Sequence, residues 1–239
     1  MSDLSTIHYV LSIEPHLEQF TFDGRLRLTV TPAGPLEVLH LNALELDVTQ
    51  CAAAQDNQAV QADVDLDPDN EALIVRLTPA LTETFTLSID FNGVINDRMA
   101  GFYRSGYQWN EEPQFMAVTH FQESDARRAF PCFDHPLHKA TFDIELIVDD
   151  DLTAISNGAV REEVPVAGGK KRVRFERTPL MSTYLVFYGV GRFESIQDEE
   201  DARVRLLTPP GGVRYGDLGL ECGRQSLAFC ESYFDIPYP

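Results

Sequence analysis

The sequence predicts an all-β fold, either a β-sandwich or a stack of curved sheets. Hydrophobic and polar residues alternate with a period of two through residues 20–30, 85–91 and 142–148, so one face of each strand is expected to be buried. Turn signals rich in proline, glycine and aspartate, such as those at residues 31–35 and 67–70, separate the hydrophobic segments. Many short strands with regular turns are typical of antiparallel sandwiches.

Further strands are expected where short runs of aliphatic, β-branched and aromatic residues lie between turn signals. They follow one another along the chain at residues 8–13, 36–41, 72–77, 115–121, 153–157, 173–176, 184–190 and 204–207. No internal repeat interrupts this order. The expected architecture is therefore all-β through most of the chain.

One amphipathic helix is expected near the C-terminus. Its apolar positions are Leu220, Leu227, Cys230 and Phe234, at helical spacings of seven, three and four residues. Gly219 and Gly223 weaken its first half, and Pro237 ends it. A single helix after an all-β region is typical of the start of another domain, so we expect one domain at residues 1–202 and the beginning of a second at residues 203–239.

The chain is strongly acidic. It has 239 residues, with 38 Asp and Glu against 19 Lys and Arg, for a formal net charge of -19. Such a charge repels phosphate backbones, so nucleic acid is excluded as an expected partner. The acidic surface either attracts cationic peptides or only keeps the protein in solution, and the composition alone leaves both readings open.

The cellular location is expected to be cytoplasmic. The N-terminus lacks the basic and apolar regions of a signal peptide, and no apolar run approaches the roughly 20 residues that span a bilayer, so no membrane partner is expected. The four cysteines lie far apart without a CxxC pair, which disfavours a zinc knuckle or a redox motif. Reduced thiols are the simplest interpretation.

Residues 119–142, with the sequence THFQESDARRAFPCFDHPLHKATF, are the most informative segment of the chain. Aromatic residues, prolines and charged residues are dense here, which predicts a loop held in one shape. We expect Asp125, Arg127 and Arg128 to form ion pairs that fix the loop rather than to act in catalysis. His135 and His138 have a spacing that could bind a metal, but Pro136 between them disfavours the helix that would align them, so no metal site is expected.

This segment resembles the signature T-Q-F-E-x-x-D-A-R-R-A-F-P-C-x-D-E-P-x-x-K-A-x-F of the N-terminal domain of M1 zinc aminopeptidases. The matching positions are Thr119, Phe121, residues 125–132, Asp134, Pro136, Lys139, Ala140 and Phe142. Residues 99–105 resemble the GFYRS turn of this family, residues 181–185 and 189–193 its last sandwich strands, and residues 234–239 the stretch that leads into its catalytic domain. The puromycin-sensitive, tricorn-interacting-factor and leukotriene A4 hydrolase branches share this resemblance.

The resemblance implies a saddle-shaped antiparallel β-sandwich at residues 1–202, followed at 203–239 by the beginning of a zinc-peptidase catalytic domain. The parent protein would be a zinc metalloaminopeptidase that removes N-terminal residues from peptides. The sequence contains neither HExxH nor GxMEN, so this chain is expected to hold no cofactor and to be catalytically inert. A non-catalytic binding or scaffolding relative of the family remains an alternative, and an unrelated all-β carbohydrate- or ligand-binding module is a third.

The resemblance also implies two substrate-binding residues and no catalytic ones. In the family, the first two polar positions of the signature, usually Gln and Glu, contact the substrate, and the carboxylate holds its α-amine. This chain has His120 and Gln122 there, as the leukotriene A4 hydrolase branch has Gln at the second position. We expect Gln122 to face the amine and His120 the substrate carbonyl, whereas Glu123 would face the other side of a continuing strand. The expected partners are a peptide N-terminus, the protein's own catalytic domain and, through the open helix, a second copy.

Overall fold

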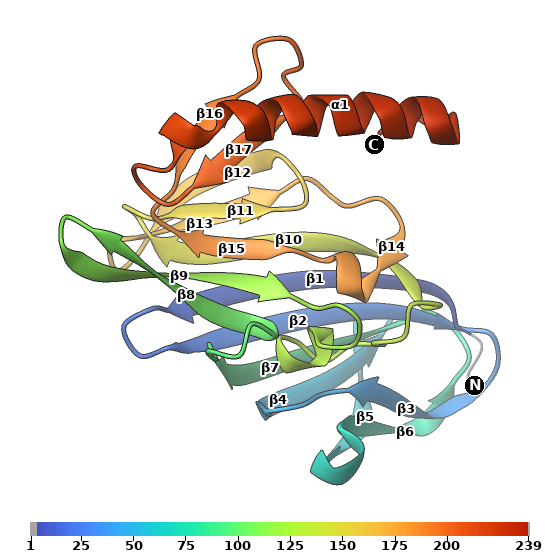
Figure 1. Cartoon of the computed structure of the whole chain (residues 1–239). Helices are drawn as coiled ribbons and strands as arrows, with labels where there is room; N and C mark the ends of the chain where they lie inside the picture. The colour runs from blue at the N-terminus through green and yellow to red at the C-terminus, as the bar shows by residue number, and fades with distance from the viewer. Residues whose placement is uncertain (1–3, 239) are drawn as a thin grey trace.

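The computed structural model describes residues 4–238, except for the side chains of residues 5 and 6, and it confirms the all-β, sandwich-like prediction (Figure 1). The described residues form seventeen strands and one α-helix, α1 (Asp217–Phe234), which follows the last strand. Four single-turn 3-10 helices connect strands: η1 (Pro68–Asn70), η2 (Ala126–Arg128), η3 (Thr183–Leu185) and η4 (Val213–Tyr215).

The larger sheet has eleven strands in the order β12-β13-β10-β1-β2-β7-β4-β5-β6-β3, with β14 paired to β10. Their bounds are β1 (Leu4–His16), β2 (Thr21–Pro32), β3 (Leu36–Asn42), β4 (Leu46–Gln55), β5 (Gln58–Asp67), β6 (Ala72–Leu81), β7 (Phe85–Val94), β10 (Lys139–Asp149), β12 (Val160–Val166), β13 (Lys170–Phe175) and β14 (Met181–Ser182). Strand pairs in this sheet are antiparallel, as expected, with the exception of β1 and β10, which run parallel with His8 opposite Thr141. A parallel pair requires a long connection, and here the intervening strands supply it.

A second sheet covers one face of the first, in the order β11-β15-β9-β8. Its bounds are β8 (Gly101–Trp109), β9 (Glu112–His120), β11 (Thr153–Ser156) and β15 (Tyr188–Gly191), and β16 (Glu194–Gln197) pairs with β17 (Arg205–Thr208) in a third sheet. The turn expected at residues 99–105 is wrong for most of its length, because β8 begins at Gly101. The strand expected at 184–190 starts only at Tyr188 because η3 precedes it. The strand expected at 115–121 ends at His120.

Aromatic rings fill the space between the two main sheets. Phe22 of β2 packs edge-on against Phe102 of β8, with ring centroids 5.3 Å apart, and Phe102 in turn packs against Tyr188 of β15. Tyr9 of β1 stacks on Phe142 of β10 at 4.8 Å. These side chains are at most 1% exposed, so the sheets are joined by a continuous aromatic core.

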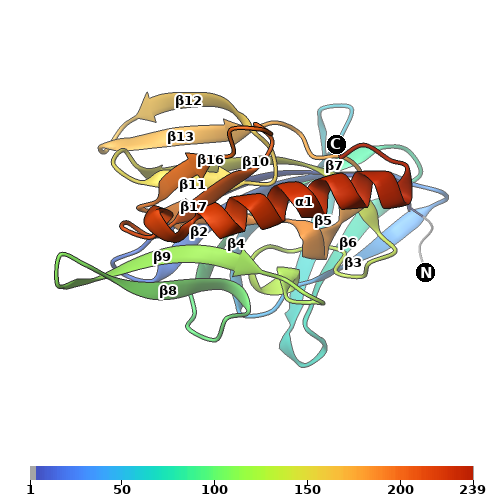
Figure 2. The same cartoon turned by 45° about the horizontal axis from the view of Figure 1, so that its top comes forward.

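Helix α1 lies over the third sheet, apart from the sandwich core (Figures 1 and 2). Its close approach depends on glycine, since a Cβ at Gly216 would lie 2.4 Å from Ile196 and one at Gly223 would lie 3.0 Å from Val204. The predicted helix is confirmed. Gly219 and Gly223, which the sequence analysis treated only as weakening the helix, lie on the face that packs against Leu206 and Val204. Leu220 and Leu227 are partly covered.

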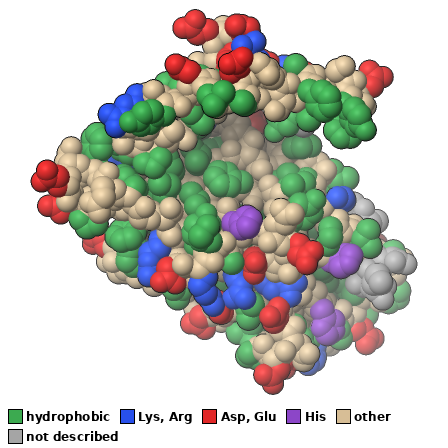
Figure 3. Space-filling view, viewed as in Figure 1, with side chains coloured by type: hydrophobic (Ala, Val, Ile, Leu, Met, Phe, Trp, Pro, Cys, Tyr) green, Lys and Arg blue, Asp and Glu red, His purple; other side chains and the backbone are tan. Residues whose placement is uncertain are grey.

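No residue of α1 is buried, and hydrophobic side chains remain open along it. The exposed ones are Leu218, Phe229, Tyr233 and Phe234, each at least 64% exposed. Figure 3 shows hydrophobic side chains gathered along the helix and on the sandwich opposite, with a hollow between them. Within residues 4–238 no helix has both the length and the apolar character needed to cross a bilayer.

Gly24 in the central strand β2 makes room for an aromatic ring, which gives a stability prediction. A Cβ on Gly24 would lie 2.3 Å from the ring of Phe91, its partner in the β2–β7 register. We predict that Gly24→Ala lowers the free energy of unfolding by about 1–3 kcal/mol, because the ring must leave its packed position. Gly34→Ala, at a position with nothing within 4 Å, is the control and should change stability by less than about 1 kcal/mol. Denaturant unfolding measures both, and equal effects of the two variants would contradict the packing argument.

Candidate functional site

The segment between β9 and β10 forms a loop packed into the body of the protein. Ala126, Ala129, Phe130 and Cys132 are fully buried, and η2 supplies one tight turn at the start of the buried stretch. The ring of Phe130 packs edge-on against both Tyr9 and Phe121. The middle of the loop is therefore part of the core, which agrees with the predicted loop held in one shape.

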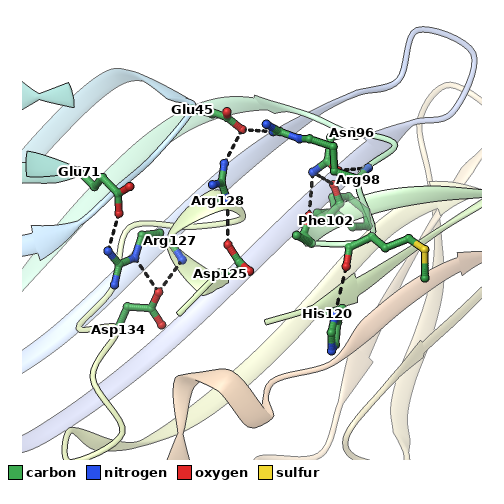
Figure 4. Close-up of polar contacts among 12 residues, drawn as sticks. Glu45, Glu71, Asn96, Arg98, Phe102, His120, Asp125, Arg127, Arg128 and Asp134 are labelled. Atoms are coloured by element: carbon green, nitrogen blue, oxygen red, sulfur yellow. Dashed lines mark hydrogen bonds and ion pairs between the residues drawn. The ribbon is translucent and has the colours of Figure 1, made fainter. Parts of the chain in front are cut away.

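Arg127 and Asp134 form the central ion pair of this loop (Figure 4). The Asp134 carboxylate is fully buried and accepts hydrogen bonds from Arg127 Nε at 2.9 Å, from the Arg127 backbone N–H at 3.2 Å and from the Thr183 hydroxyl at 3.2 Å. Arg127 Nη1 donates to Glu71 at 2.6 Å, just beyond η1. Burial raises the pKa of Asp134, and the hydrogen bonds from Arg127 and Thr183 act against that rise.

Arg128 forms a second set of ion pairs on the other side of η2. Its Nε donates to Asp125 at 2.8 Å, and its Nη1 lies 2.8 Å from Glu45, which also pairs with Arg98. The hydrogen bond from Arg98 is the main reason that the pKa of Glu45 is lowered, and Arg128 adds to the effect. The predicted ion-pair network of Asp125, Arg127 and Arg128 is confirmed. Sequence reasoning missed the partners Glu45 and Glu71, which the folded sheets bring in from distant positions.

Backbone hydrogen bonds attach the same loop to the larger sheet. Asn42 and Cys132 exchange two bonds, of 2.7 Å and 3.0 Å, and the Leu44 N–H donates to the Arg127 carbonyl at 2.9 Å. The Phe133 N–H donates to the hydroxyl of Tyr9 at 3.0 Å. Few orientations of the loop satisfy all of these partners, so its shape is fixed by the surrounding strands.

The predicted substrate-binding residues lie at the exposed start of the loop. His120 is the last residue of β9, and Phe121, only 1% exposed, anchors the chain before the exposed turn of Gln122, Glu123 and Ser124. The peptide bond between Gln122 and Glu123 is cis. The expectation that Glu123 faces the opposite side of a strand is wrong, because β9 ends at His120 and both Gln122 and Glu123 are exposed in the turn.

His120 has one defined contact, a 3.1 Å hydrogen bond between its ring Nδ1 and the carbonyl of Met99 (Figure 4). Met99 belongs to the segment that leads into β8, so two neighbouring strands orient the ring. His120 and Gln122 are thus placed next to each other along the chain, one on each side of the buried Phe121 anchor.

His135 and His138 lie at the far end of the loop, with ring centroids 6.1 Å apart. Burial lowers the pKa of His138, and the neighbouring His135 lowers it further. Across residues 4–238, no three His, Cys, Asp or Glu side chains come together in a group that could hold a metal ion. The donor set of the described chain therefore does not fit a zinc ion.

Three hollows in the described surface lie away from this loop. Two, of about 470 and 350 Å³, lie on the larger sheet and share Ser12 in their lining. The third, of about 640 Å³, lies between β11 and the β16–β17 pair. None of the three is lined by His120, Gln122 or Glu123, which are all exposed.

Proteins with similar sequences identify the family of this chain. The family model of the peptidase M1 N-terminal domain matches residues 5–185. The chain belongs to the peptidase M1 family. It is 40% identical to aminopeptidase M1-C of Oryza sativa subsp. japonica over 97% of its length and 36% identical to aminopeptidase 2 of Candida albicans over 100%. It is 36% identical to the puromycin-sensitive aminopeptidase of Caenorhabditis elegans over 97%.

The chain spans about a quarter of the length of the curated relatives that it matches. It covers 26% of the Oryza protein, 26% of the Candida protein and 25% of the Caenorhabditis protein. The match with the family model extends from β1 through η3 and therefore includes the whole loop with its ion pairs. The family resemblance of the sequence is confirmed.

The buried ion pair gives a second stability prediction. Arg127→Met should lower the free energy of unfolding of this M1 domain by about 3–5 kcal/mol, because it leaves the Asp134 carboxylate buried without its cation. Arg177→Met is the matched control: Arg177 makes two hydrogen bonds to Asp143 but is 59% exposed, so its loss should cost about 0–1 kcal/mol. Chemical denaturation of both variants measures the difference. A loss at Arg127 no larger than that at Arg177 would show that the loop does not depend on this pair.

Proposed function

We propose that this chain is the substrate-contacting N-terminal domain of a zinc metalloaminopeptidase that removes N-terminal residues from peptides. The observation that carries the proposal is the fixed loop, whose buried middle supports the exposed side chains of His120, at the end of β9, and Gln122, in the turn that follows. A rigid support is what a substrate contact needs, since a loosely held group loses binding free energy to its own ordering. The three relatives compared above are all aminopeptidases, which supports the same activity for the whole protein.

The proposed ligand of Gln122 is the free α-amine of a peptide. A protonated amine needs hydrogen-bond acceptors, and the side-chain oxygen of Gln122 is one. A neutral acceptor holds an ammonium group less strongly than a carboxylate does, because only the carboxylate adds an opposite charge to the hydrogen bond. Glutamine at this position is also the feature that favours the alternative proposal, a non-catalytic relative that binds without hydrolysis.

We propose that the zinc ligands of the whole protein lie outside this chain and that the chain alone is inert. The proposal is supported by the sequence, which has no HExxH pair, and by the described residues, whose donor groups do not fit a metal. The division into residues 1–202 and 203–239 belongs to the same proposal. The position of α1 beside the sandwich, in contact mainly with β17 and η4, supports it, although β17 pairs with β16 across the boundary.

The partners follow from the surface of α1. Its open hydrophobic side chains would be covered by the remaining part of the protein, or by a second copy when that part is missing. We also propose a cytoplasmic location, supported by the free thiols of Cys51, Cys132, Cys222 and Cys230, which suit a reducing compartment.

The contact at Gln122 is tested in the whole enzyme. Gln122→Glu should tighten the binding of an inhibitor with a free α-amine by about 1–2 kcal/mol, or roughly 5- to 30-fold, because the ammonium group then meets a carboxylate instead of a neutral oxygen. The N-acetylated form of the same inhibitor carries no charge there and should gain nothing. Calorimetric Kd values for both ligands decide the outcome.

Glu123→Gln is the control for the register of the turn. If Gln122→Glu leaves the Kd of the free-amine ligand unchanged and Glu123→Gln weakens it, Glu123 is the amine partner and the assignment to Gln122 is wrong. A whole protein that binds the free-amine ligand but hydrolyses no aminoacyl substrate would support the non-catalytic alternative.

A further inference from the structure

The contact of His120 with Met99 determines which ring nitrogen carries the proton. A backbone carbonyl only accepts hydrogen bonds, so Nδ1 of His120, 3.1 Å from the Met99 oxygen, must be the donor. In an uncharged imidazole a single nitrogen bears hydrogen, and the other offers a lone pair. The uncharged ring therefore has Nε2 free of hydrogen.

The Met99 carbonyl is itself held in place by Asn96. The side-chain amide of Asn96 donates to the carbonyls of Ala100, at 2.8 Å, and Phe102, at 3.1 Å, and its oxygen accepts from the Arg98 N–H at 2.8 Å. These three bonds close the chain around Met99, which adopts a positive φ of 58°. Asn96 thus fixes the acceptor to which the His120 ring is bonded.

The closed segment is attached to the ion pairs of the 119–142 loop (Figure 4). Arg98 pairs with Glu45, the same carboxylate that pairs with Arg128. Gly101 has a φ of +68° and packs directly on Arg128, because a Cβ at this glycine would lie 2.7 Å from the Arg128 Cβ. The orientation of the His120 ring therefore depends on the network that fixes the rest of the loop.

We propose that His120 is a hydrogen-bond acceptor toward the substrate, through Nε2, and that Asn96 is the positioning residue that sets this polarity. The inference rests on the proposed function. It replaces the expectation that His120 faces a substrate carbonyl, because an uncharged ring whose only N–H is used by Met99 has no hydrogen to give a carbonyl. The ligand group that suits Nε2 is an N–H donor, and the strongest such donor on a peptide is its protonated α-amine.

His120 and Gln122 then have related roles. Each offers one neutral acceptor, His120 from the exposed end of β9 and Gln122 from the exposed turn, so together they provide two uncharged acceptors for a cationic amine. An N–H donor at position 120 would instead face the N–H groups of the ammonium and repel them. The polarity of the ring is therefore a determinant of specificity for free-amine substrates over N-blocked ones.

The polarity is tested first on this chain, without a substrate. In a ¹⁵N-histidine-labelled sample at about pH 8.5, above the ordinary range of imidazole protonation, the His120 signals are assigned by their loss in His120→Gln. We expect a protonated Nδ1 and an unprotonated Nε2. Asn96→Ala should move the His120 ring toward a mixture of both tautomers. A wild-type ring with the proton on Nε2 overturns the inference, whether or not the Asn96 variant folds.

The contact is tested second in the whole enzyme, with phenylalanine amide and its N-acetyl derivative as probes. His120→Leu removes the acceptor and should weaken the free-amine probe by roughly five- to tenfold more than the acetylated one. His120→Gln restores an acceptor oxygen and should recover most of that loss. Equal weakening of both probes by His120→Leu overturns the inference.

The two tests separate the inference from the proposed function. If Gln122→Glu tightens the free-amine ligand but Nε2 of His120 carries the proton, only the inference is wrong. If the whole protein binds neither probe, both the inference and the proposed function are wrong.

Discussion

The buried pair of Arg127 and Asp134 is the interaction on which the arrangement of the loop depends. A carboxylate with a fully buried side chain cannot be left without a cation, so the position of Asp134 dictates where the Arg127 guanidinium lies. The Arg127 backbone then meets the Leu44 N–H beside β3, and its side chain meets Glu71. Thr183, in the segment between the two sheets, bonds to the same carboxylate, so one ion pair connects the loop to both layers of the sandwich.

These buried contacts hold the exposed turn in one conformation. The ring of Phe121 packs against those of Phe130 and Tyr188, and the turn that contains Gln122 follows Phe121 directly. Arg128 extends the network through Glu45 toward the segment that carries the Met99 carbonyl. The loop therefore offers its two polar side chains from a support that needs no ligand to become ordered, which is how binding sites limit the entropic cost of association.

The sequence predicted the strands that are marked by a local pattern of alternating hydrophobic and polar residues. Strict alternation predicted β2, β7 and β10, each of which buries one face against the aromatic core. β4 and β5 were missed because they are polar or alanine-rich and largely exposed, so no periodic signal marks them. The ion pairs inside the loop were predicted from its charges, whereas Glu45 and Glu71 depend on tertiary proximity. His120 and Gln122 follow from family resemblance alone, and the tautomer of His120 depends on a carbonyl 21 residues away.

The central claim is that the 119–142 loop is held rigid by this chain alone, and amide hydrogen exchange tests it most directly. The N–H groups of Phe130, Cys132 and Phe133 all have hydrogen-bond partners within the protein, whereas the β8–β9 tip around Asn110 is exposed. The account predicts that these three amides exchange as slowly as those of β2 and β7 in the core. Exchange of the same amides as fast as that of the Asn110 tip would contradict it.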